Sequence, residues 1–324
     1  MSALLDIEDL KVTFNTRYGE VTALDSVSLH VNQGETLGIV GESGCGKSIT
    51  ALSVMGLIPS PPGRIAGGSI RLNGEELTSA TPARLRAIRG AEAAMIFQEP
   101  MTSLNPVFTC GDQIAEAIML HQKVGRSQAR SAAVALLDRV GIPEPDARAR
   151  DFPHQLSGGM RQRVMIAMAV SCRPKMLIAD EPTTALDVTV QAQIFDLLNE
   201  IQRDFGAAIV LITHDMGAIA EMADRVAVMY AGRVIENGTA DGVLDTAQHP
   251  YARGLIDCIP NIAKGDTTLR EIPGVVPPLH RLGAGCAFAD RCAHVADRCR
   301  REKPALVAHG PHPVACHAVE EGRI

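Results

Sequence analysis

The sequence predicts an α/β fold followed by a small, loop-rich C-terminal extension, and three observations lead to it. A buried strand, a glycine-rich turn and a helix start follow one another within residues 35–57. Strand and helix patterns alternate again from residue 157 onward. The composition then changes near residue 246: eight of the 19 prolines and six of the ten histidines fall between His249 and the end.

The length and composition of the chain are typical of a globular protein. Its 324 residues suffice for one large domain or two of ordinary size, and 46% of them are hydrophobic. No apolar run is long enough to span a bilayer, and the first residues lack the features of a signal peptide, so we expect a cytoplasmic location. A net charge of −6 gives no basic surface for nucleic acid, and we expect no such partner.

The first ninety residues are expected to consist mainly of strands. Alternating apolar residues predict strands over 5–10 and 27–31. The short run at 35–40 predicts a buried strand, and 49–57 a helix that stops before Pro59. A further strand and turn are expected over 69–74.

The middle of the chain is expected to be helical from about residue 102 to 151. The pattern is clearest over 127–140, where apolar residues recur at helical spacing, and Gly141 follows as a helix stop. The alternation after residue 157 predicts, in order, a strand over 175–179, a helix over 190–205, a strand over 208–213 and a hairpin at 230–233.

The spacing Gly41-x4-Gly46-Lys47-Ser48 is that of a phosphate-binding loop. Its glycines let several backbone N–H groups point at phosphate oxygens. Lys47 is expected to reach the β- and γ-phosphates of a nucleotide, and the Ser48 hydroxyl to bind Mg²⁺. The expected nucleotide-binding residues here are Gly41, Glu42, Ser43, Gly44, Cys45, Gly46, Lys47, Ser48 and Ile49. A glycine-rich turn that matches by chance is the alternative, and the motifs downstream argue against it.

Two acidic residues follow the predicted strand at 175–179. Asp180 is expected to face Mg²⁺, and Glu181 to polarise the water that attacks the γ-phosphate. A strand that merely ends in two solvated acids is the alternative. In a chain that also carries a phosphate loop, the pair favours ATP hydrolysis.

A second glycine-rich helix start occurs at Ser157-Gly158-Gly159, which opens a predicted helix that runs through Ala169. The N-terminus of a helix with small residues is an anion-binding site. Two such sites are more than one nucleotide needs. We therefore expect this one to serve an ATP molecule that is bound mainly by another subunit.

With these motifs in this order, residues 4–245 resemble the ATP-binding-cassette (ABC) ATPases. The resemblance implies a RecA-like core with an antiparallel β subdomain and a helical subdomain near 100–160. It also implies two subunits that sandwich two ATP molecules. We therefore predict an ABC-type P-loop NTPase over 1–245, with Lys47, Glu181 and His214 in catalytic roles.

The resemblance assigns roles to residues outside the loop. Gln98 matches the glutamine loop, which touches Mg²⁺ and the transmembrane coupling helix. Ser157, Gly158 and Gly159 match the signature that closes on the opposite subunit's γ-phosphate. Asp187, in Ala185-Leu-Asp187, matches the loop that contacts the other subunit, and His214 the switch histidine at the γ-phosphate.

An aromatic side chain is expected to stack on adenine upstream of the phosphate loop. We assign Phe14, which is expected to end the first strand. Tyr18, in an apparent short extension, is the alternative.

The C-terminal extension indicates which branch of the ABC ATPases the chain resembles. The segments 249–255, 272–274 and 285–292, with Cys316-His317, resemble the C-terminal extension of oligopeptide and dipeptide importer ATPases, which nickel importers share. This implies a domain over 246–324 and a place on the cytoplasmic face of the membrane. The implied partners are a second ABC ATPase, expected to be a paralogue, two permease subunits and an extracytoplasmic binding protein.

Four cysteines crowd the tail: Cys286, Cys292, Cys299 and Cys316. In a reducing compartment such a group favours a metal site over disulfides. The spacing C-x5-C-x6-C-x16-C lacks the paired C-x2-C of common zinc modules. It suits an iron–sulfur cluster, and the resemblance implies [4Fe–4S]. Zinc and unliganded thiols are the alternatives.

Peptide import is the function that this resemblance implies, and there are three alternatives to it. A nickel or other small-solute importer of the same family is the first alternative. A soluble ABC ATPase of DNA repair or translation is the second, although such proteins usually carry coiled-coil inserts or two cassettes. A regulatory iron–sulfur protein that uses ATP only as a ligand is the third, and the Asp180-Glu181 pair argues against it.

Overall fold

The computed structural model describes residues 3–99, 103–184, 186–258 and 271–324. The chain divides into two compact units. The first unit comprises 1–31, 36–79 and 211–324, and the second comprises 32–35 and 80–210. Within the described ranges, no helix is both long and apolar enough to cross a membrane.

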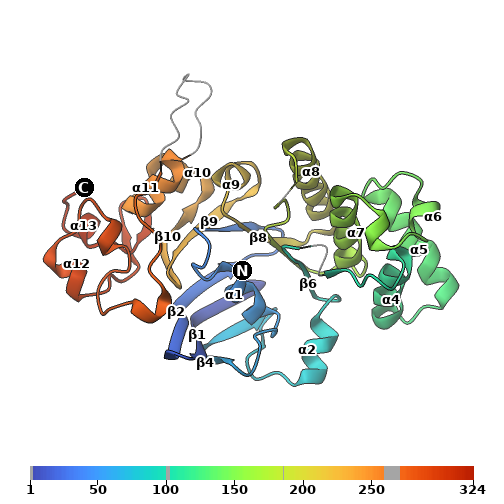
Figure 1. Ribbon diagram of the computed structural model, residues 1–324, viewed down its shortest axis with the longest axis horizontal. Helices are drawn as coiled ribbons and strands as arrows, with labels where there is room; N and C mark the ends of the chain where they lie inside the picture. The colour runs from blue at the N-terminus through green and yellow to red at the C-terminus, as the bar shows by residue number, and fades with distance from the viewer. Residues whose placement is uncertain (1–2, 100–102, 185, 259–270) are drawn as a thin grey trace. The chain divides into compact units, whose positions relative to one another are not determined.

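An antiparallel sheet forms one part of the first unit (Figure 1). Its strands are β1 (Leu5–Thr16), β2 (Gly19–Val31), β4 (Gly63–Leu72) and β5 (Glu75–Glu76), in the order β2-β1-β4-β5. The strands predicted over 5–10 and 27–31 are parts of β1 and β2, which are longer. The register shifts between Ile7 and Leu10, where Asp9 has a positive φ of 47°. This β-bulge interrupts the alternation, so the sequence pattern ends before the pairing does.

A second set of strands in the first unit has the order β11-β12-β10-β9-β3. The bounds are β3 (Thr36–Val40), β9 (Arg225–Tyr230), β10 (Arg233–Thr239), β11 (Val307–His309) and β12 (His312–Val314). The pair β3 and β9 is parallel, and every residue of β3 is buried, as expected for a strand covered on both faces. The predicted hairpin is confirmed, because Tyr230 pairs with Arg233 across the turn from β9 to β10.

The helices of the first unit are α1 (Lys47–Val54), α9 (Met216–Met222), α10 (Ala240–Thr246), α11 (Pro250–Asp257), α12 (Asp297–Arg301) and α13 (His317–Glu320). Helix α1 begins two residues earlier than predicted, at Lys47 within the phosphate loop, and ends three residues earlier than predicted, with Met55 as its C-cap.

The C-terminal extension shares the hydrophobic core of the first unit. Val40 and Tyr230, from β3 and β9, belong to the same buried cluster as Tyr251 of α11, Phe288 and Ala315. The rings of Tyr230 and Phe288 lie 5.3 Å apart, edge to face. Residues 211–324 therefore form one compact unit with the N-terminal part of the chain. A functional boundary near residue 246 stays a prediction.

A buried polar cluster also joins the extension to β10. Glu236 is fully buried, and its carboxylate accepts hydrogen bonds from the backbone N–H groups of Gln248 and His249 at 2.7 and 2.8 Å. The Nε2 atom of His312, in β12, lies 2.6 Å from Glu236 Oε1. Burial lowers the pKa of His249 to about 3, so its ring is neutral, and its Nδ1 caps α11 by accepting from the N–H of Tyr251.

The longest of the described helices lie in the second unit (Figure 1). The helices of this unit are α2 (Pro82–Ile88), α4 (Cys110–Gln122), α5 (Arg126–Arg139), α6 (Pro145–Arg148), α7 (Gly158–Val170) and α8 (Val188–Phe205). Its strands are β6 (Ala93–Ile96) and β7 (Met176–Asp180), which pair in parallel, and β7 also neighbours β8 (Ala208–Thr213), whose last residues enter the first unit. The helices expected over 127–140 and 190–205 are confirmed within two residues at each end.

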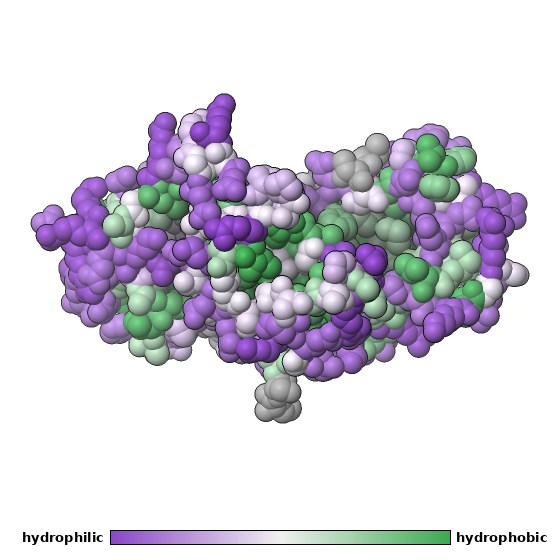
Figure 2. Space-filling view, turned by 90° about the horizontal axis from the view of Figure 1, so that it is seen from below, coloured by the Kyte–Doolittle hydropathy of each residue, from purple (hydrophilic) through white to green (hydrophobic). Residues whose placement is uncertain are grey.

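Hydrophilic residues cover most of the face seen in Figure 2, and the hydrophobic residues there form separate patches. The large apolar side chains that are exposed in the second unit include Phe97, Val107, Phe108, Leu120 and Val188. Single exposed apolar side chains are ordinary. Val107 and Phe108 are adjacent in sequence, between β6 and α4.

Candidate functional site

The phosphate loop joins β3 to α1 in the first unit. Gly41 and Gly46 have positive φ angles of 156° and 109°. A Cβ atom at Gly41 would clash with the carbonyl oxygen of Met229, and one at Gly46 would lie 2.7 Å from a methyl group of Leu24. Both positions therefore require glycine. The strand, the tight turn and the helix start that the motif needs are all present.

The side chain of Lys47 folds back onto the phosphate loop. Its Nζ donates to the carbonyl oxygens of Gly41 and Glu42 at 2.6 and 3.2 Å. Only 5% of Lys47 is exposed, and two carbonyl groups of the loop accept hydrogen bonds from its ammonium group. Cys45 is also buried, and burial raises the pKa of its thiol. A protonated thiol of this kind gives no support to a redox role.

The two aromatic candidates for adenine stacking lie near the β1–β2 turn. The expectation that Phe14 ends the first strand is wrong, because β1 continues to Thr16 in pairing with β2. Phe14 is half-buried and pairs with Gly63 of β4. Tyr18 is 59% exposed and stacks on His280, with the ring centroids 4.3 Å apart. Adenine stacking on either ring stays a prediction.

The second unit brings Gln98 and Glu181 together. Asp180 ends the buried strand β7, and Glu181 follows with a positive φ of 46°. The Nε2 atom of Gln98 donates to Glu181 Oε2 at 2.9 Å, and the Thr184 hydroxyl donates to the same oxygen at 2.8 Å. The carboxylate is therefore held by residues from two segments. The sequence interpretation missed Thr184, which the turn Glu181-x-x-Thr184 could have suggested.

Two helices of the second unit begin at predicted site residues. Ser157 caps α7 by accepting a hydrogen bond from Met160 N–H, and Asp187 caps α8 by accepting from Val190 N–H. A Cβ atom on Gly159 would lie 3.1 Å from a methyl group of Val190. The starts of α7 and α8 are therefore closely packed. Gly158 is exposed in the first turn of α7. Ala185, which precedes Asp187 in the predicted loop, lies outside the described residues.

The expected nucleotide-binding residues are divided between the units. The first unit carries Lys47, Ser48 and His214, which is exposed between β8 and α9. The second unit carries Gln98, Asp180, Glu181 and the signature residues. Each unit presents its share at the ends of strands and at the starts of helices, as expected for ligand sites in α/β proteins.

All four clustered cysteines line one small cavity in the first unit, together with His249, His294 and His317. The four cysteines form no disulfides. Burial raises the pKa of Cys286 to about 11, and the other three cysteines add to the rise. Four thiols in one cavity are the donor chemistry that an iron–sulfur cluster or zinc takes. As they stand, no three His, Cys, Asp or Glu side chains in the described part of the chain are arranged to hold a metal ion.

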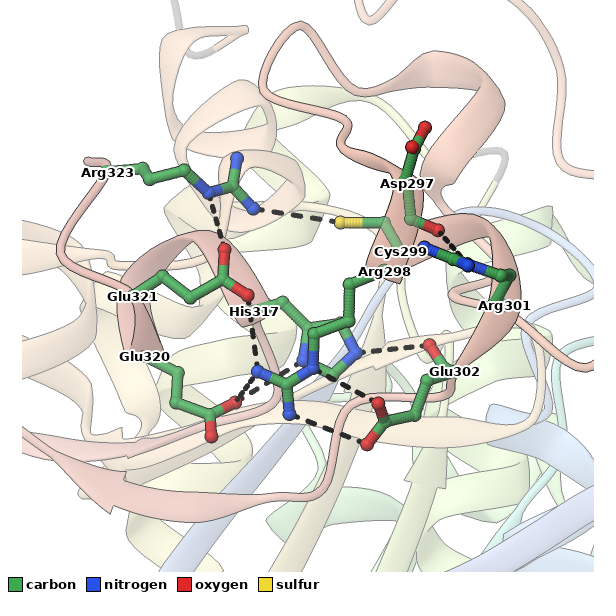
Figure 3. A network of polar contacts seen from close by, with 9 residues as sticks. All are labelled: Asp297, Arg298, Cys299, Arg301, Glu302, His317, Glu320, Glu321 and Arg323. Carbon is green, nitrogen blue, oxygen red and sulfur yellow. Dashed lines mark hydrogen bonds and ion pairs between the residues drawn. The ribbon is translucent and has the colours of Figure 1, made fainter.

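A network of polar contacts ties together the segments that carry two of these cysteines (Figure 3). Arg298, beside Cys299, bonds Glu302, Glu320 and Glu321. His317, beside Cys316, contacts Glu302 O at 3.1 Å through Nε2 and Glu320 at 3.3 Å through Nδ1. The network therefore joins α12 to α13. This contact brings the third and fourth cysteines into one place, although they are far apart in sequence.

Comparisons with known proteins agree with this geometry. The family described as "ABC transporter" matches residues 24–184, and the region described as "Oligopeptide/dipeptide transporter, C-terminal region" matches residues 235–299. The chain is 49% identical to the oligopeptide transport ATP-binding protein AppD of Bacillus subtilis, over 99% of this chain and 98% of AppD. It is 51% identical to the dipeptide transport ATP-binding protein DppD of Escherichia coli, over 94% of this chain and 93% of DppD.

Solved structures show the same fold. The dimeric ATP-binding cassette MJ0796 bound to ADP and Pi superposes with a TM-score of 0.66 at 25% identity, covering 73% of this chain and 98% of that one. The cassette cbiO1 of Clostridium perfringens gives a TM-score of 0.63 at 28% identity, covering 76% and 92%. The chain belongs to the ABC transporter ATP-binding family, with the C-terminal region of its oligopeptide and dipeptide branch.

Proposed function

We propose that this chain is the ATP-hydrolysing subunit of an importer for dipeptides or oligopeptides. The observation that carries the proposal is the full-length likeness to peptide transport ATP-binding proteins, which extends through the C-terminal region. The nucleotide motifs support the ATPase part of the proposal, because the phosphate loop, the Asp180-Glu181 pair and the signature helix all have the required local structure.

On this proposal, the phosphates of ATP compete with the carbonyl groups of Gly41 and Glu42 for Lys47. Mg²⁺, which would neutralise phosphate charge, would be held by Ser48, Gln98 and Asp180. Glu181 takes a proton from the attacking water as the new O–P bond forms and the bond to the ADP oxygen breaks. The hydrogen bonds from Gln98 and Thr184 orient the Glu181 carboxylate for this role.

The remaining motif residues are proposed to act across a dimer of ATPase subunits. Ser157, Gly158 and Gly159 would present the exposed start of α7 to the ATP of the partner, with Asp187 beside them. His214 would contact the γ-phosphate of its own subunit's ATP, and Phe14 or Tyr18 would stack on adenine. A related cassette has been solved as a dimer with ADP and Pi. We propose a paralogue as the second ATPase.

The proposed partners also include two permease subunits and an extracytoplasmic binding protein, with this chain peripheral to the cytoplasmic face of the membrane. The exposed side chains of Val107 and Phe108 lie on the second unit, in the segment that follows Gln98. They supply an apolar surface of the kind that partners cover. A nickel importer of the same family is the alternative.

The experiment that tests the transport proposal is a pull-down of this chain from its native membranes in mild detergent, with mass spectrometry of the bound proteins. We expect two permeases, a second cassette ATPase and a peptide-type binding protein. A soluble homodimer without membrane proteins would leave only the ATPase. A nickel-type binding protein in the eluate would favour the alternative.

We further propose that Cys286, Cys292, Cys299 and Cys316 hold a metal centre, with [4Fe–4S] favoured over zinc. The convergence of the four thiols on one cavity supports the proposal. Binding would require the thiols to deprotonate and turn toward the metal.

Purification without oxygen is expected to yield about four iron atoms per chain and an absorbance shoulder near roughly 400 nm. Cys299→Ser is expected to lose both signals, whereas Cys172→Ser, which alters a cysteine outside the cavity, is expected to keep them. Zinc in place of iron would select the second alternative. Absence of both metals from the anaerobic wild-type protein would mean that the thiols are unliganded.

A further inference from the structure

An arginine of the C-terminal extension is bonded to the phosphate loop within the first unit. Arg291 lies in a short 3₁₀ turn, Ala289–Arg291, between Cys286 and Cys292. Its Nη1 donates to Glu42 Oε2 at 2.6 Å, and its Nη2 donates to Glu42 Oε1 at 3.1 Å. Two parallel bonds of this kind fix both the position and the plane of a carboxylate.

The guanidinium group of Arg291 is itself held firmly. Its Nε donates to Pro273 O at 2.8 Å and its Nη2 to Ile272 O at 3.1 Å, while the rings of Tyr230 and Phe288 lie within 6 Å. Only 4% of the Arg291 side chain is exposed, against 32% for Glu42. Although burial lowers the pKa of Arg291, its bonds to Glu42 and Tyr230 raise that pKa above the usual value, so the charge is kept.

A second residue of the extension reaches the backbone of the same glutamate. The N–H of Glu42 donates to the hydroxyl oxygen of Tyr251 at 2.8 Å, and Tyr251 is fully buried in α11. The carbonyl oxygen of Glu42 accepts from Lys47. The side chain and the N–H of Glu42 are thus fixed by the extension, and its carbonyl is linked to the lysine of the phosphate loop.

We propose that Arg291 is a positioning residue for nucleotide binding, which acts through Glu42 to set the conformation of the phosphate loop. This inference rests on the proposed ATPase function. The N–H groups of the loop must converge on the phosphates, so a displacement of the loop weakens the hydrogen bonds that hold ATP. Through this contact, the affinity of the chain for ATP depends on the C-terminal extension. Arg291 is bonded to Glu42 and not to Lys47, so it acts on the phosphate loop indirectly, through Glu42.

The kinetic signature separates positioning from a purely structural role. The phosphate loop holds ATP both before and during hydrolysis, so loosening it raises KM and leaves kcat largely unchanged. A structural role would instead lower the fraction of folded protein, which reduces apparent kcat at constant KM. Affinity measured directly for a fluorescent ATP analogue gives a readout that does not require turnover.

The experiment uses the full-length chain, assembled with its transporter partners, in five variants. They are Arg291→Lys, Arg291→Gln, Glu42→Gln, the double variant that combines Arg291→Gln with Glu42→Gln, and Arg300→Gln as the control. Arg300 pairs with Asp290 at 3.0 Å in the same extension, but both side chains are well exposed. Arg291→Lys keeps the charge and loses the bidentate geometry, so it remains informative if Arg291→Gln folds poorly.

We expect Arg291→Gln to raise KM and the Kd of the analogue by about tenfold or more, the usual worth of hydrogen bonds between charged groups. Arg291→Lys is expected to fall between that variant and the wild type, Arg300→Gln to match the wild type, and the double variant to be no worse than the single ones.

Wild-type KM and Kd in folded Arg291 variants, or effects of Arg291→Gln and Glu42→Gln that simply add, would overturn the positioning role while leaving the ATPase proposal intact. A wild-type chain that neither binds nor hydrolyses ATP would overturn both. A wild-type chain that binds without hydrolysing still reports on Arg291 through the Kd.

Discussion

Replacing Glu181 by Gln is expected to stop ATP turnover while ATP still binds. The amide cannot take a proton from the attacking water, and loss of a general base lowers rates by about 100- to 10,000-fold. The substitution keeps the size of the side chain, and the amide oxygen can still accept the hydrogen bonds from Gln98 and Thr184. The left-handed turn at Glu181 is therefore retained. The measurement is phosphate release by the purified protein, with nucleotide affinity determined in parallel.

The control for this experiment is Glu200→Gln, because Glu200 is an exposed glutamate on α8. It is expected to leave both turnover and binding unchanged. Wild-type turnover in Glu181→Gln would show that another group activates the water. Loss of ATP binding in that variant would mean that the carboxylate has a role in holding the nucleotide.

Replacing Glu236 by Ala is expected to lower the free energy of unfolding by about 3 kcal/mol or more. The substitution leaves three partners of the buried carboxylate without it: the N–H groups of Gln248 and His249, and the ring of His312. It also opens a cavity where β10, β12 and the start of α11 meet. Unfolding in urea, followed by circular dichroism, gives the measurement.

Asp290→Ala is the matched control for Glu236→Ala. It also removes one carboxylate together with its hydrogen bond, but the Asp290–Arg300 ion pair is exposed, so we expect a change of about 1 kcal/mol or less. Equal effects in the two variants would show that the buried cluster contributes no more than a surface pair. In that case the attachment of the extension would rest on its apolar contacts.

The sequence predicted those parts of the fold and of the site whose structure is determined by residues close together in the chain. The phosphate loop, the end of β7 and the starts of α7 and α8 lie within short segments whose residue types restrict the backbone directly. Gln98 and His214 carry no such signal alone. They were assigned by resemblance, and the structure brings Gln98 to Glu181. The roles of these residues in catalysis stay predictions.

The features that the sequence did not predict depend on contacts between distant segments. Strands β11 and β12 have three residues each, too few to show alternation, yet they extend the sheet that contains β10, β9 and β3. The composition change near residue 246 indicates a small, loop-rich extension, but it does not indicate that Tyr251 and Phe288 fill a core shared with β9. The contact between Arg291 and Glu42 spans 249 positions of the chain. Nothing near either residue indicates its partner.

The central claim, that this chain hydrolyses ATP to drive peptide import, is tested most directly by the transporter complex reconstituted in lipid vesicles. We expect ATP hydrolysis to rise when the binding protein is loaded with a short peptide. We expect no such rise with nickel, or with peptide when Glu181 is replaced by Gln. Hydrolysis that does not respond to peptide, or that persists at the wild-type rate in the Glu181→Gln complex, would contradict the account.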